Sequence, residues 1–132
     1  MIIYSDKIDD VVKDKLTGFF VGWKKPLSSE KHYMLLKGST YFIVAIDTKD
    51  NRTVGFVTAL TDGINSSFIP LLEVLPEFQR KGIGTELMKR ILEKLNDITN
   101  IDLTCDLPMQ SFYKRFDMLK SHGMVIRKYL SD

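Results

Sequence analysis

Apolar residues recur at two spacings along this chain, and each spacing predicts a type of element. Residues 41–46 and 53–60 are continuous apolar and β-branched runs, which are typical of buried strands. The polar stretch 47–52 between them predicts a hairpin. A turn signal at residues 61–63 leads into a third run, 66–75, so we expect a three-stranded meander.

Helical spacing occurs in three other segments. Residues 83–95 place apolar side chains on one side, which predicts a long amphipathic helix. A second helix is expected at residues 29–37, with a serine cap and with Gly38 to end it. Near the N-terminus, Ser5 or Asp6 can cap another helix, whose apolar face would comprise Ile8, Val11, Val12, Leu16, Phe19 and Phe20.

The remaining segments complete the expected order. Residues 2–4 form a short strand candidate, and residues 101–105 form another that follows the long helix. A strand, a helix and a strand in succession predict a locally parallel pair. A short helix opened by proline is expected at residues 108–116. Residues 118–120 and 124–129 are expected to form a closing strand pair.

Composition narrows the class of protein. A chain of 132 residues with 44% hydrophobic content predicts one domain, residues 1–132, with a substantial core. The formal net charge of +2 argues against a nucleic-acid partner. A single cysteine excludes a disulfide framework and Cys-x-x-Cys metal sites, so no metal is expected. Because the chain shows neither a leader pattern nor a membrane-spanning apolar run, we expect a cytoplasmic protein with no membrane partner.

The turn before the long helix carries the clearest chemistry. An apolar run ends at Pro76, a basic and glycine-rich turn follows, and the helix begins directly after Gly82. Glycines let backbone N–H groups converge, and the helix dipole favours an anion there. Arg80 and Lys81 add positive charge. The turn lacks the Gly-Lys-Ser/Thr ending of a Walker A loop, and Leu87 stands where a dinucleotide fingerprint needs its third glycine.

This turn resembles the acyl-CoA-binding signature of the GNAT superfamily of N-acyltransferases, in which Gln/Arg-x-x-Gly-x-Gly/Ala lies between a strand and a helix. The matching residues are Val74, Pro76 and the run Gln79-Arg80-Lys81-Gly82-Ile83-Gly84. The order of predicted elements is also the GNAT order, so the resemblance covers essentially the whole chain. It implies an α/β fold with a mixed, mostly antiparallel sheet, a central parallel strand pair splayed around the cofactor, and helices on both faces.

The resemblance implies acetyl-CoA as the co-substrate and assigns residues to it. Pantetheine would pair with backbone groups near Glu73, Val74 and Leu75. The pyrophosphate would meet the N–H groups of the turn and of the first helical residues, which are Gln79, Arg80, Lys81, Gly82, Ile83, Gly84 and Thr85. Asp106 stands where the superfamily often has a cofactor-contacting asparagine, although a carboxylate that caps the following helix is the simpler interpretation.

The same resemblance assigns the chemistry to Tyr113. In this superfamily an amine attacks the thioester carbonyl, and the tyrosine of a Phe-Tyr-x-x-x-Gly-Phe segment approaches the CoA sulfur as a proton donor. Here the segment begins at Phe112, with Asp117 in place of the glycine and Met118 in place of the second phenylalanine. Aspartate tolerates a left-handed conformation better than most residues. The alternative for Tyr113 is a half-buried tyrosine whose hydroxyl bonds to the backbone.

Other residues have two interpretations each. Glu73 is a candidate general base or water holder, or a solvated strand carboxylate. Trp23 lies in a loop that lines the acceptor pocket in GNAT enzymes, and it is either a substrate-binding element or a plug over the core. Cys105 is expected to be a buried, inert thiol, and His32 and His122 are expected at the surface.

These observations give one principal expectation and one alternative. We expect an acetyl-CoA-dependent N-acetyltransferase that acetylates a primary amine by direct attack, with Tyr113 as the acid. The alternative is a non-catalytic acyl-CoA sensor or regulatory domain on the same fold. The acceptor would be a small-molecule or peptide amine that no recognisable pattern identifies. The terminal strands leave both a homodimer and a monomer open.

Overall fold

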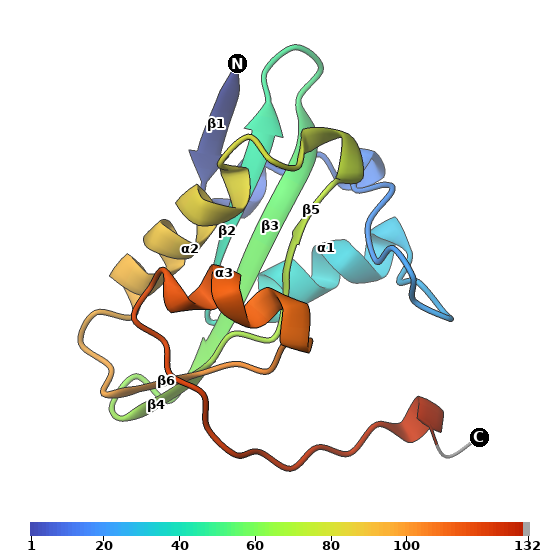
Figure 1. Ribbon diagram of the computed structural model, residues 1–132. Coiled ribbons are helices and arrows are strands. Elements are labelled where there is room, and N and C mark those ends of the chain that lie inside the picture. The colour runs from blue at the N-terminus through green and yellow to red at the C-terminus, as the bar shows by residue number, and fades with distance from the viewer. Residues whose placement is uncertain (131–132) are drawn as a thin grey trace.

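A twisted sheet with helices on both faces forms the computed structural model, which describes residues 1–130 (Figure 1). The strands are β1 (Ile2–Ser5), β2 (Tyr41–Asp47), β3 (Arg52–Thr61), β4 (Ser66–Phe68), β5 (Leu72–Val74) and β6 (Asn100–Asp102). The α-helices are α1 (Ser29–Gly38), α2 (Ile83–Lys94) and α3 (Gln110–Lys114). Short 3-10 helices lie at Ile8–Asp10, Lys13–Lys15, Pro76–Phe78, Leu107–Met109 and Lys128–Leu130.

The sheet has the strand order β1-β2-β3-β4-β6, and β5 also pairs with β3. Every pairing is antiparallel except that of β4 with β6. The predicted β2–β3 hairpin is confirmed, and both of its strands are almost continuously buried. The predicted α/β class is therefore confirmed, with a mostly antiparallel sheet and one parallel pair.

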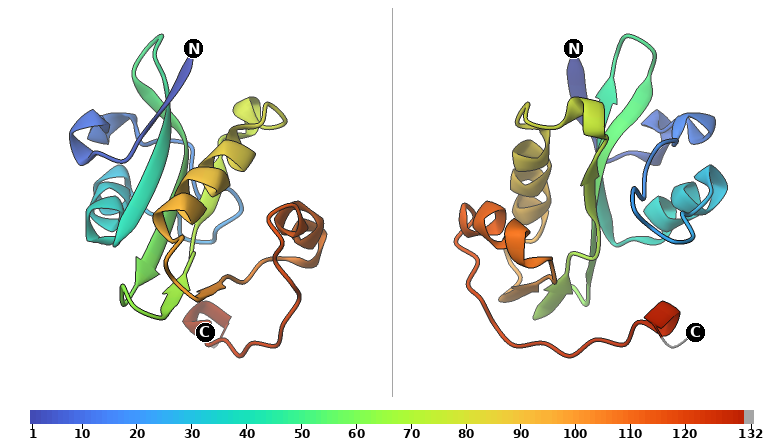
Figure 2. Two further views of the ribbon diagram at one scale, coloured as in Figure 1. Left: turned by 90° about the vertical axis from the view of Figure 1, so that its left-hand side faces the viewer. Right: turned by 45° about the vertical axis from the view of Figure 1, so that its right-hand side comes forward.

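The two longer helices cover opposite faces of this sheet (Figure 2). Helix α1 begins as predicted, because the Ser28 hydroxyl accepts a hydrogen bond from the Lys31 N–H, 3.2 Å. Helix α2 packs on β2 and β3 through Ile83, Leu87, Met88 and Ile91. Gly55 of β3 permits this close approach, since a Cβ there would lie 3.2 Å from Leu87 Cδ1. Within residues 1–130, no helix has the length and apolar content needed to cross a bilayer.

The helix predicted after Ser5 is wrong. The chain forms two short 3-10 turns instead, followed by a loop with left-handed residues at Gly18 and Phe20, φ 82° and 64°. The Ser5 hydroxyl accepts from the Lys7 N–H at 3.0 Å, which is a local turn rather than a helix cap. Much of the predicted apolar face is still buried, at Val11, Leu16, Phe19 and Phe20. Helical spacing therefore predicted burial for four of these six residues correctly, missed the 40% exposure of Val12 and the partial burial of Ile8, and predicted the wrong backbone conformation.

The predicted closing strand pair is also wrong. After α3, Asp117 adopts a left-handed conformation, φ 62°. Residues 118–127 then run as irregular extended chain, outside any strand, and end in the 3-10 turn Lys128–Leu130. Figures 1 and 2 show this segment passing beneath the sheet and standing clear of it. Its residues have the composition of a strand but pair with no strand in the described part of the chain.

Candidate functional site

The parallel pair opens into a V because β4 and β6 pair over only three residues. The register ends at Phe68 opposite Asp102, and Ile69 donates one further backbone hydrogen bond to the Asp102 carbonyl, 2.9 Å. Pro70 follows; by alternation it faces β3, and it has no N–H with which to continue the pairing of β4 with that strand. The predicted run 66–75 is therefore two strands, of which β5 turns away along β3. The splayed pair expected from the sequence is present.

Strand β5 presents to this opening a backbone edge that pairs with no strand among residues 1–130. The Leu71 carbonyl accepts from β3 at 3.1 Å, and the Leu75 N–H donates to β3 at 2.9 Å. Because successive residues of a strand point their polar groups to opposite sides, Leu72 and Val74 direct theirs away from β3. Of the residues expected to meet pantetheine, Val74 has this outward orientation. The N–H of Leu75 is bonded within the sheet, and its side chain is 1% exposed.

Two left-handed residues build the turn between β5 and α2. Arg80 has φ 64°, and Gly82, the N-cap of α2, has φ 82°. Glycine adopts this conformation at little steric cost. The Gln79 side chain folds back from the turn, and its Nε2 donates to the Val74 carbonyl at 3.0 Å. The turn thus places the Gln79 side chain on the open edge of β5, while the backbone of the turn itself faces away from that strand.

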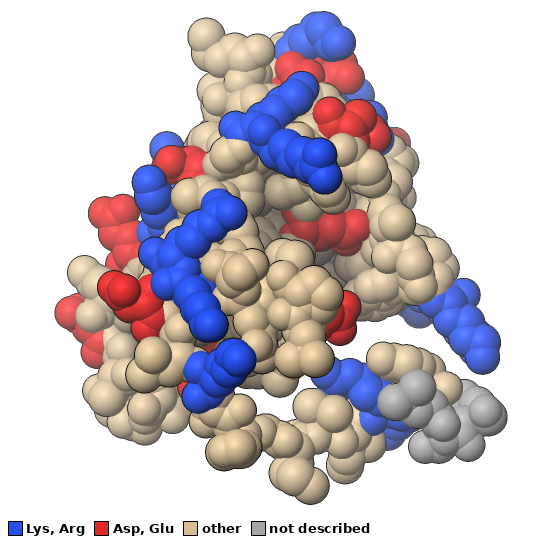
Figure 3. All heavy atoms as spheres, in the orientation of Figure 1, with Lys and Arg blue, Asp and Glu red and all other residues tan. Residues whose placement is uncertain are grey.

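The start of α2 supplies backbone donors. The Gly82 carbonyl accepts from the Glu86 N–H at 3.1 Å, so the N–H groups before Glu86 have no partner within the helix. These donors belong to Ile83, Gly84 and Thr85. Arg80 and Lys81 are exposed, and basic side chains gather over the turn, α2 and α3 on this face (Figure 3). Free N–H groups, the positive end of the helix dipole and two cations favour an anion here.

Gly84 brings the parts of the site into contact. A Cβ on this residue would lie 3.6 Å from the Phe112 ring and 3.9 Å from Val74 Cγ2. The first turn of α2 therefore packs between β5 and α3. Phe112 in turn contacts Tyr113 and Phe116 edge to face, with ring centroids 5.0 and 5.4 Å apart. The ring contacts lie within α3 and its last turn, and it is the packing of Phe112 against Gly84 that places α3 beside the first turn of α2.

Tyr113 is half-buried on α3, and burial raises the pKa of its phenol to about 12. The neighbouring Cys105 thiol acts in the same direction. The phenol therefore keeps its proton throughout the neutral range. Within residues 1–130 the hydroxyl forms no hydrogen bond, so the backbone partner of the alternative interpretation is not observed. The left-handed Asp117 ends this segment as expected.

The Glu73 carboxylate holds the N-terminal loop. Its two oxygens accept from the Phe20 N–H at 2.8 and 2.9 Å, and one of them accepts from the Val21 N–H at 3.3 Å. A φ of 64° is costly for a residue with a side chain, and these hydrogen bonds stabilise it at Phe20. Sequence reasoning identified Glu73 but missed Phe20 and Val21 as its partners, because a backbone donor leaves no residue-type signal.

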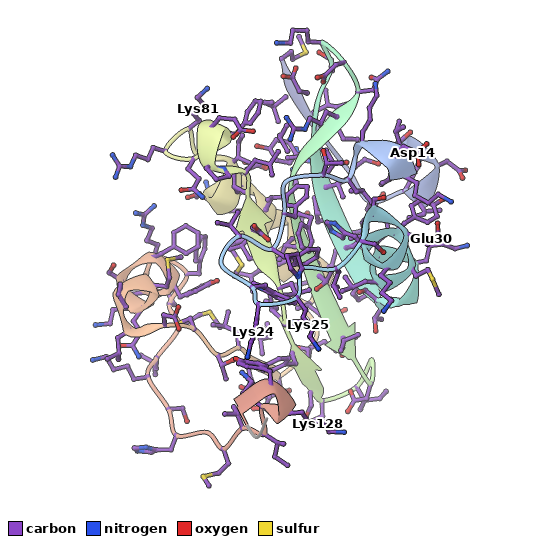
Figure 4. All side chains as sticks on the ribbon, turned by 90° about the vertical axis from the view of Figure 1, so that its right-hand side faces the viewer. Asp14, Lys24, Lys25, Glu30, Lys81 and Lys128 are labelled. Atoms are coloured by element: carbon purple, nitrogen blue, oxygen red, sulfur yellow. The ribbon has the colours of Figure 1, made fainter. Side chains whose placement is uncertain are left out.

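Trp23 packs partly on the core and is partly exposed, so its side chain is available for the substrate contact that the sequence predicts. The backbone N–H of Trp23 donates to the Phe20 carbonyl at 3.1 Å, and the centroids of the two side-chain rings are 4.8 Å apart. The side chain is nevertheless 46% exposed. One face of the indole therefore covers the core while the other is open to solvent. Lys24 and Lys25 follow it in the same loop (Figure 4).

The expectation for His32 was wrong. This residue is 1% exposed and lies among the rings of Phe19, Phe20 and Phe56, with centroids 5.1, 4.9 and 4.4 Å away. Neither ring nitrogen has a partner in the described residues, and burial lowers the pKa to about 4. The i,i+4 spacing to Leu36, which is fully buried, was the available signal that α1 turns both residues inward.

The expectation for Cys105 was wrong as well. It is exposed, because β6 ends at Asp102 and the chain has already left the sheet. Asp106 is exposed and occupies the N-cap position of the 3-10 helix Leu107–Met109, but its side chain makes no capping hydrogen bond. Over residues 1–130, no group of three or more His, Cys, Asp or Glu is arranged to hold a metal ion.

Comparisons with known proteins agree with this geometry. The profile of the acetyltransferase (GNAT) family matches residues 8–118. Two uncharacterized N-acetyltransferases named ycf52, from Pyropia yezoensis and Porphyra purpurea, are each 33% identical over 106 residues. Each alignment covers 76% of this chain and 59% of the relative, so the chain spans less than two thirds of these relatives' length.

Solved structures resemble the whole fold. An acetyltransferase-type structure from Deinococcus radiodurans R1 is 37% identical with a TM-score of 0.93, covering 97% of this chain and 89% of that one. A GNAT family acetyltransferase from Streptococcus pneumoniae TIGR4 is 27% identical with a TM-score of 0.77, covering 96% and 98%.

Proposed function

Because this chain belongs to the acetyltransferase (GNAT) family, we propose that it transfers the acetyl group of acetyl-CoA to an amine. The observation that carries the proposal is the position of Gly84, against Val74 on one side and Phe112 on the other. This residue joins an open strand edge, an anion-binding turn and a helix bearing a protonated phenol. The acceptor is an amine of a small molecule or a peptide.

The three features suit the three parts of the co-substrate. The outward N–H and C=O groups of Leu72 and the outward N–H of Val74 offer hydrogen bonds to the pantetheine amides, while the Val74 carbonyl is held by Gln79. The N–H groups at the start of α2, with Arg80 and Lys81, suit the pyrophosphate. The space beside Gly82 is open, since a Cβ on this residue would meet no atom within 4 Å, and this leaves room for the pyrophosphate. Tyr113 is then the residue that would approach the sulfur atom of acetyl-CoA.

The chemistry is aminolysis of a thioester. The neutral amine adds to the carbonyl carbon, a C–N bond forms, and the C–S bond breaks. The amine loses its proton to water, and the departing thiolate receives hydrogen-bond donation and a proton from Tyr113, which regains a proton from water. Glu73 supports this reaction by holding the Phe20–Val21 backbone in place, which positions the loop that carries Trp23.

The direct test measures free thiol. Purified protein is incubated with acetyl-CoA and a panel of primary amines, and thiol release is compared with the rate without amine. We expect amine-dependent release and a matching acetylated product. Normal CoA binding without release for any amine, tested across small-molecule and peptide acceptors, would contradict the transferase and favour an acyl-CoA sensor.

The Tyr113→Phe substitution tests the proposed acid. Loss of the hydroxyl should lower kcat by roughly 10²-fold or more, because general acid catalysis contributes that much. CoA affinity, measured by calorimetry, should change little since the ring remains. Phe112→Tyr is a poor control because Phe112 packs on Gly84, so Tyr129→Phe, an exposed tyrosine far along the chain, serves instead. Equal turnover in wild type and Tyr113→Phe would remove Tyr113 from the mechanism.

A further inference from the structure

A row of three side chains crosses the sheet at the base of the V, and we call it the acceptor row. Leu60 of β3 pairs with Phe68 of β4, and Phe68 pairs with Asp102 of β6. Directly paired residues of neighbouring strands point to the same face of a sheet, so all three side chains share one face. Ser67, which alternates to the other face, is 6% exposed, whereas Leu60 and Phe68 are 46% and 37% exposed.

The acceptor row lies on the face that α1 covers. Phe56 of β3 packs against His32 of α1, with ring centroids 4.4 Å apart. Leu60 follows Phe56 at an even spacing in the same strand, so alternation places both on this face. Helix α1 covers Phe56 but leaves Leu60 and its partners exposed. The base of the V is therefore accessible from this side of the sheet.

Two carboxylates face this side, one on each limb of the V. Glu73 of β5 pairs with Phe56, so it shares the same face. Asp102 ends β6, and its carbonyl accepts from the Ile69 N–H at 2.9 Å, just where the two limbs separate. Glu73 and Asp102 thus flank the opening.

Only one of these carboxylates has its oxygens occupied. Those of Glu73 accept from the backbone N–H groups of Phe20 and Val21 at 2.8 to 3.3 Å. Asp102 is exposed, and among residues 1–130 its carboxylate forms neither an ion pair nor a hydrogen bond. A cationic group that enters the V from this side can therefore pair with Asp102 without displacing a protein contact.

The acceptor has to enter from this side because the proposed co-substrate occupies the other. Helices α2 and α3 both lie on the face opposite α1 (Figure 2), and Gly84 of α2 packs against Phe112 of α3. The anion-binding turn and Tyr113 belong to that opposite side. The loop that carries Trp23 lies on the α1 face, since Phe20 contacts both Trp23 and His32. Amine and thiolate would then meet the thioester from opposite faces.

Charge on the α1 face determines where an ammonium group can bind. Residues 17–28 contain Lys24 and Lys25 and no acidic residue, and Figure 4 shows both side chains extending from the loop. An alkylamine is mostly protonated at neutral pH, so these lysines repel it while Asp102 attracts it. A second ammonium group on the same molecule would meet Phe68 and Leu60, where desolvation of a charge is costly.

We propose that Asp102 binds the ammonium group of the acceptor and that Phe68 and Leu60 contact its apolar body, so the acceptor is a monoamine with an apolar chain. The acceptor row spans two inter-strand spacings, roughly 10 Å, which sets the length of that chain. This inference rests on the proposed acetyl transfer to an amine. The two carboxylates then have different roles, because Glu73 anchors the loop while Asp102 places the amine nitrogen at the base of the V.

Calorimetry tests the acceptor row without any transfer step, on the protein alone and with saturating CoA. Hexylamine should bind about tenfold or more tightly than hexanol, which lacks the charge, and than hexamethylenediamine, which has a second one. Asp102→Asn should weaken hexylamine binding about tenfold or more and leave hexanol binding unchanged. Asp97→Asn removes an exposed carboxylate in the turn before β6 and is the matched control, with wild-type affinity expected.

Three calorimetric results would overturn the proposal. They are equal hexylamine affinity in the wild type and in Asp102→Asn, hexylamine binding no tighter than hexanol in the wild type, and no measurable binding of hexylamine to the wild type. Each of these results concerns the acceptor row alone, because the titrations involve no acetyl group.

Kinetics separate a failure of this inference from a failure of the proposed function. Asp102→Asn should raise the KM for hexylamine about tenfold or more and leave the KM for acetyl-CoA unchanged. Leu60→Ser should raise the KM for hexylamine but not for ethylamine, which is too short to reach this end of the row. Acetylation of hexylamine with equal KM in the wild type and Asp102→Asn would overturn the role of Asp102 while the transferase stands. Binding of hexylamine that depends on Asp102, without acetylation of any amine, would support the acceptor row and contradict the transferase.

Discussion

Gly82 and Arg80 both have positive φ in the turn between β5 and α2, at 82° and 64°. The two positions use this conformation differently. The left-handed conformation is strained at Arg80, because this residue has a Cβ. Gly82 has none, so it adopts the same conformation at little steric cost at the N-cap of α2. The glycine pattern in the sequence predicted the turn because this backbone requirement is local. Nothing comparable in the residue types indicated that Arg80 would also be left-handed.

Gly82→Ala isolates the backbone requirement, since a Cβ at this position would meet no atom within 4 Å. A left-handed alanine costs about 1–2 kcal/mol, so the turn should shift and CoA affinity should fall about tenfold by calorimetry. Gly38→Ala is the matched control, because Gly38 ends α1 without a positive φ and also has open space around it. Equal CoA affinity in the two variants would contradict the role of the turn.

His32 gives the fold a dependence on pH. Its pKa in the folded protein, about 4, lies below the ordinary 6.5 because burial disfavours the charged ring. The unfolded chain therefore binds the proton more readily, and stability is fully present above pH 6.5 and is lost as the pH falls toward 4. Between pH 7.5 and 4.5 this residue should remove about 2.5 kcal/mol from the free energy of unfolding.

Urea unfolding of His32→Phe at these two pH values measures that contribution. Phenylalanine fills a similar space among three phenylalanine rings and leaves no unpaired nitrogen, so the difference between the two pH values should shrink by about 2.5 kcal/mol. His122→Phe changes the same residue type at an exposed position and should leave the difference unaltered. If the wild type, His32→Phe and His122→Phe all show the same difference in unfolding free energy between the two pH values, the pH dependence comes from groups other than His32.

At the scale of elements, the sequence predicted those whose hydrogen bonds are local or whose apolar run is long. Helices α1 and α2 and the β2–β3 hairpin have capping residues, clear periodicity or continuous burial. The segment after Ser5 has helical spacing, but its backbone is set by contacts with distant residues such as Glu73. Such contacts carry no periodic signal, and the loop that they shape is also the part of the site least visible in the sequence.

Glu73→Ala tests the link between β5 and this loop. Loss of the hydrogen bonds to Phe20 and Val21 should free the loop, raise the KM for the amine about tenfold and speed hydrogen exchange at residues 17–26, since a bond to a charged group contributes about 1.5–3 kcal/mol. Glu73→Gln keeps one acceptor oxygen and should recover part of the effect. Glu77→Ala, which removes an exposed carboxylate nearby, should change neither quantity.

The same variants distinguish an anchor from a base. If Glu73 removes the amine proton, both substitutions should lower kcat and abolish the acidic limb of its pH profile. An anchoring carboxylate leaves the shape of that profile unchanged while the KM rises. A fall in kcat with unaltered loop exchange would therefore rule out the anchoring role.

At the scale of the whole molecule, the sequence predicted the mixed, mostly antiparallel sheet with one parallel pair and the helices on its two faces. It did not predict the fate of the C-terminal residues, because a strand-forming sequence does not specify which edge it pairs with. Met118 stays partly buried under α3 while Met124, six residues later, is almost fully exposed. The residue types after Asp117 therefore indicated a strand-forming composition but not the irregular backbone that the segment adopts.

Pro70 has a consequence that reaches beyond the strand it interrupts. The alternation of the backbone changes at Pro70, since the Ile69 N–H faces β6 whereas the Leu71 carbonyl, two residues later, faces β3. The break lies in the backbone rather than in a movable side chain, so the slot beside β5 is part of the ground state of the folded chain. A receptor that is preorganised in this way loses little conformational entropy when a ligand enters. For the co-substrate proposed above, we therefore expect recognition closer to lock-and-key than to induced fit.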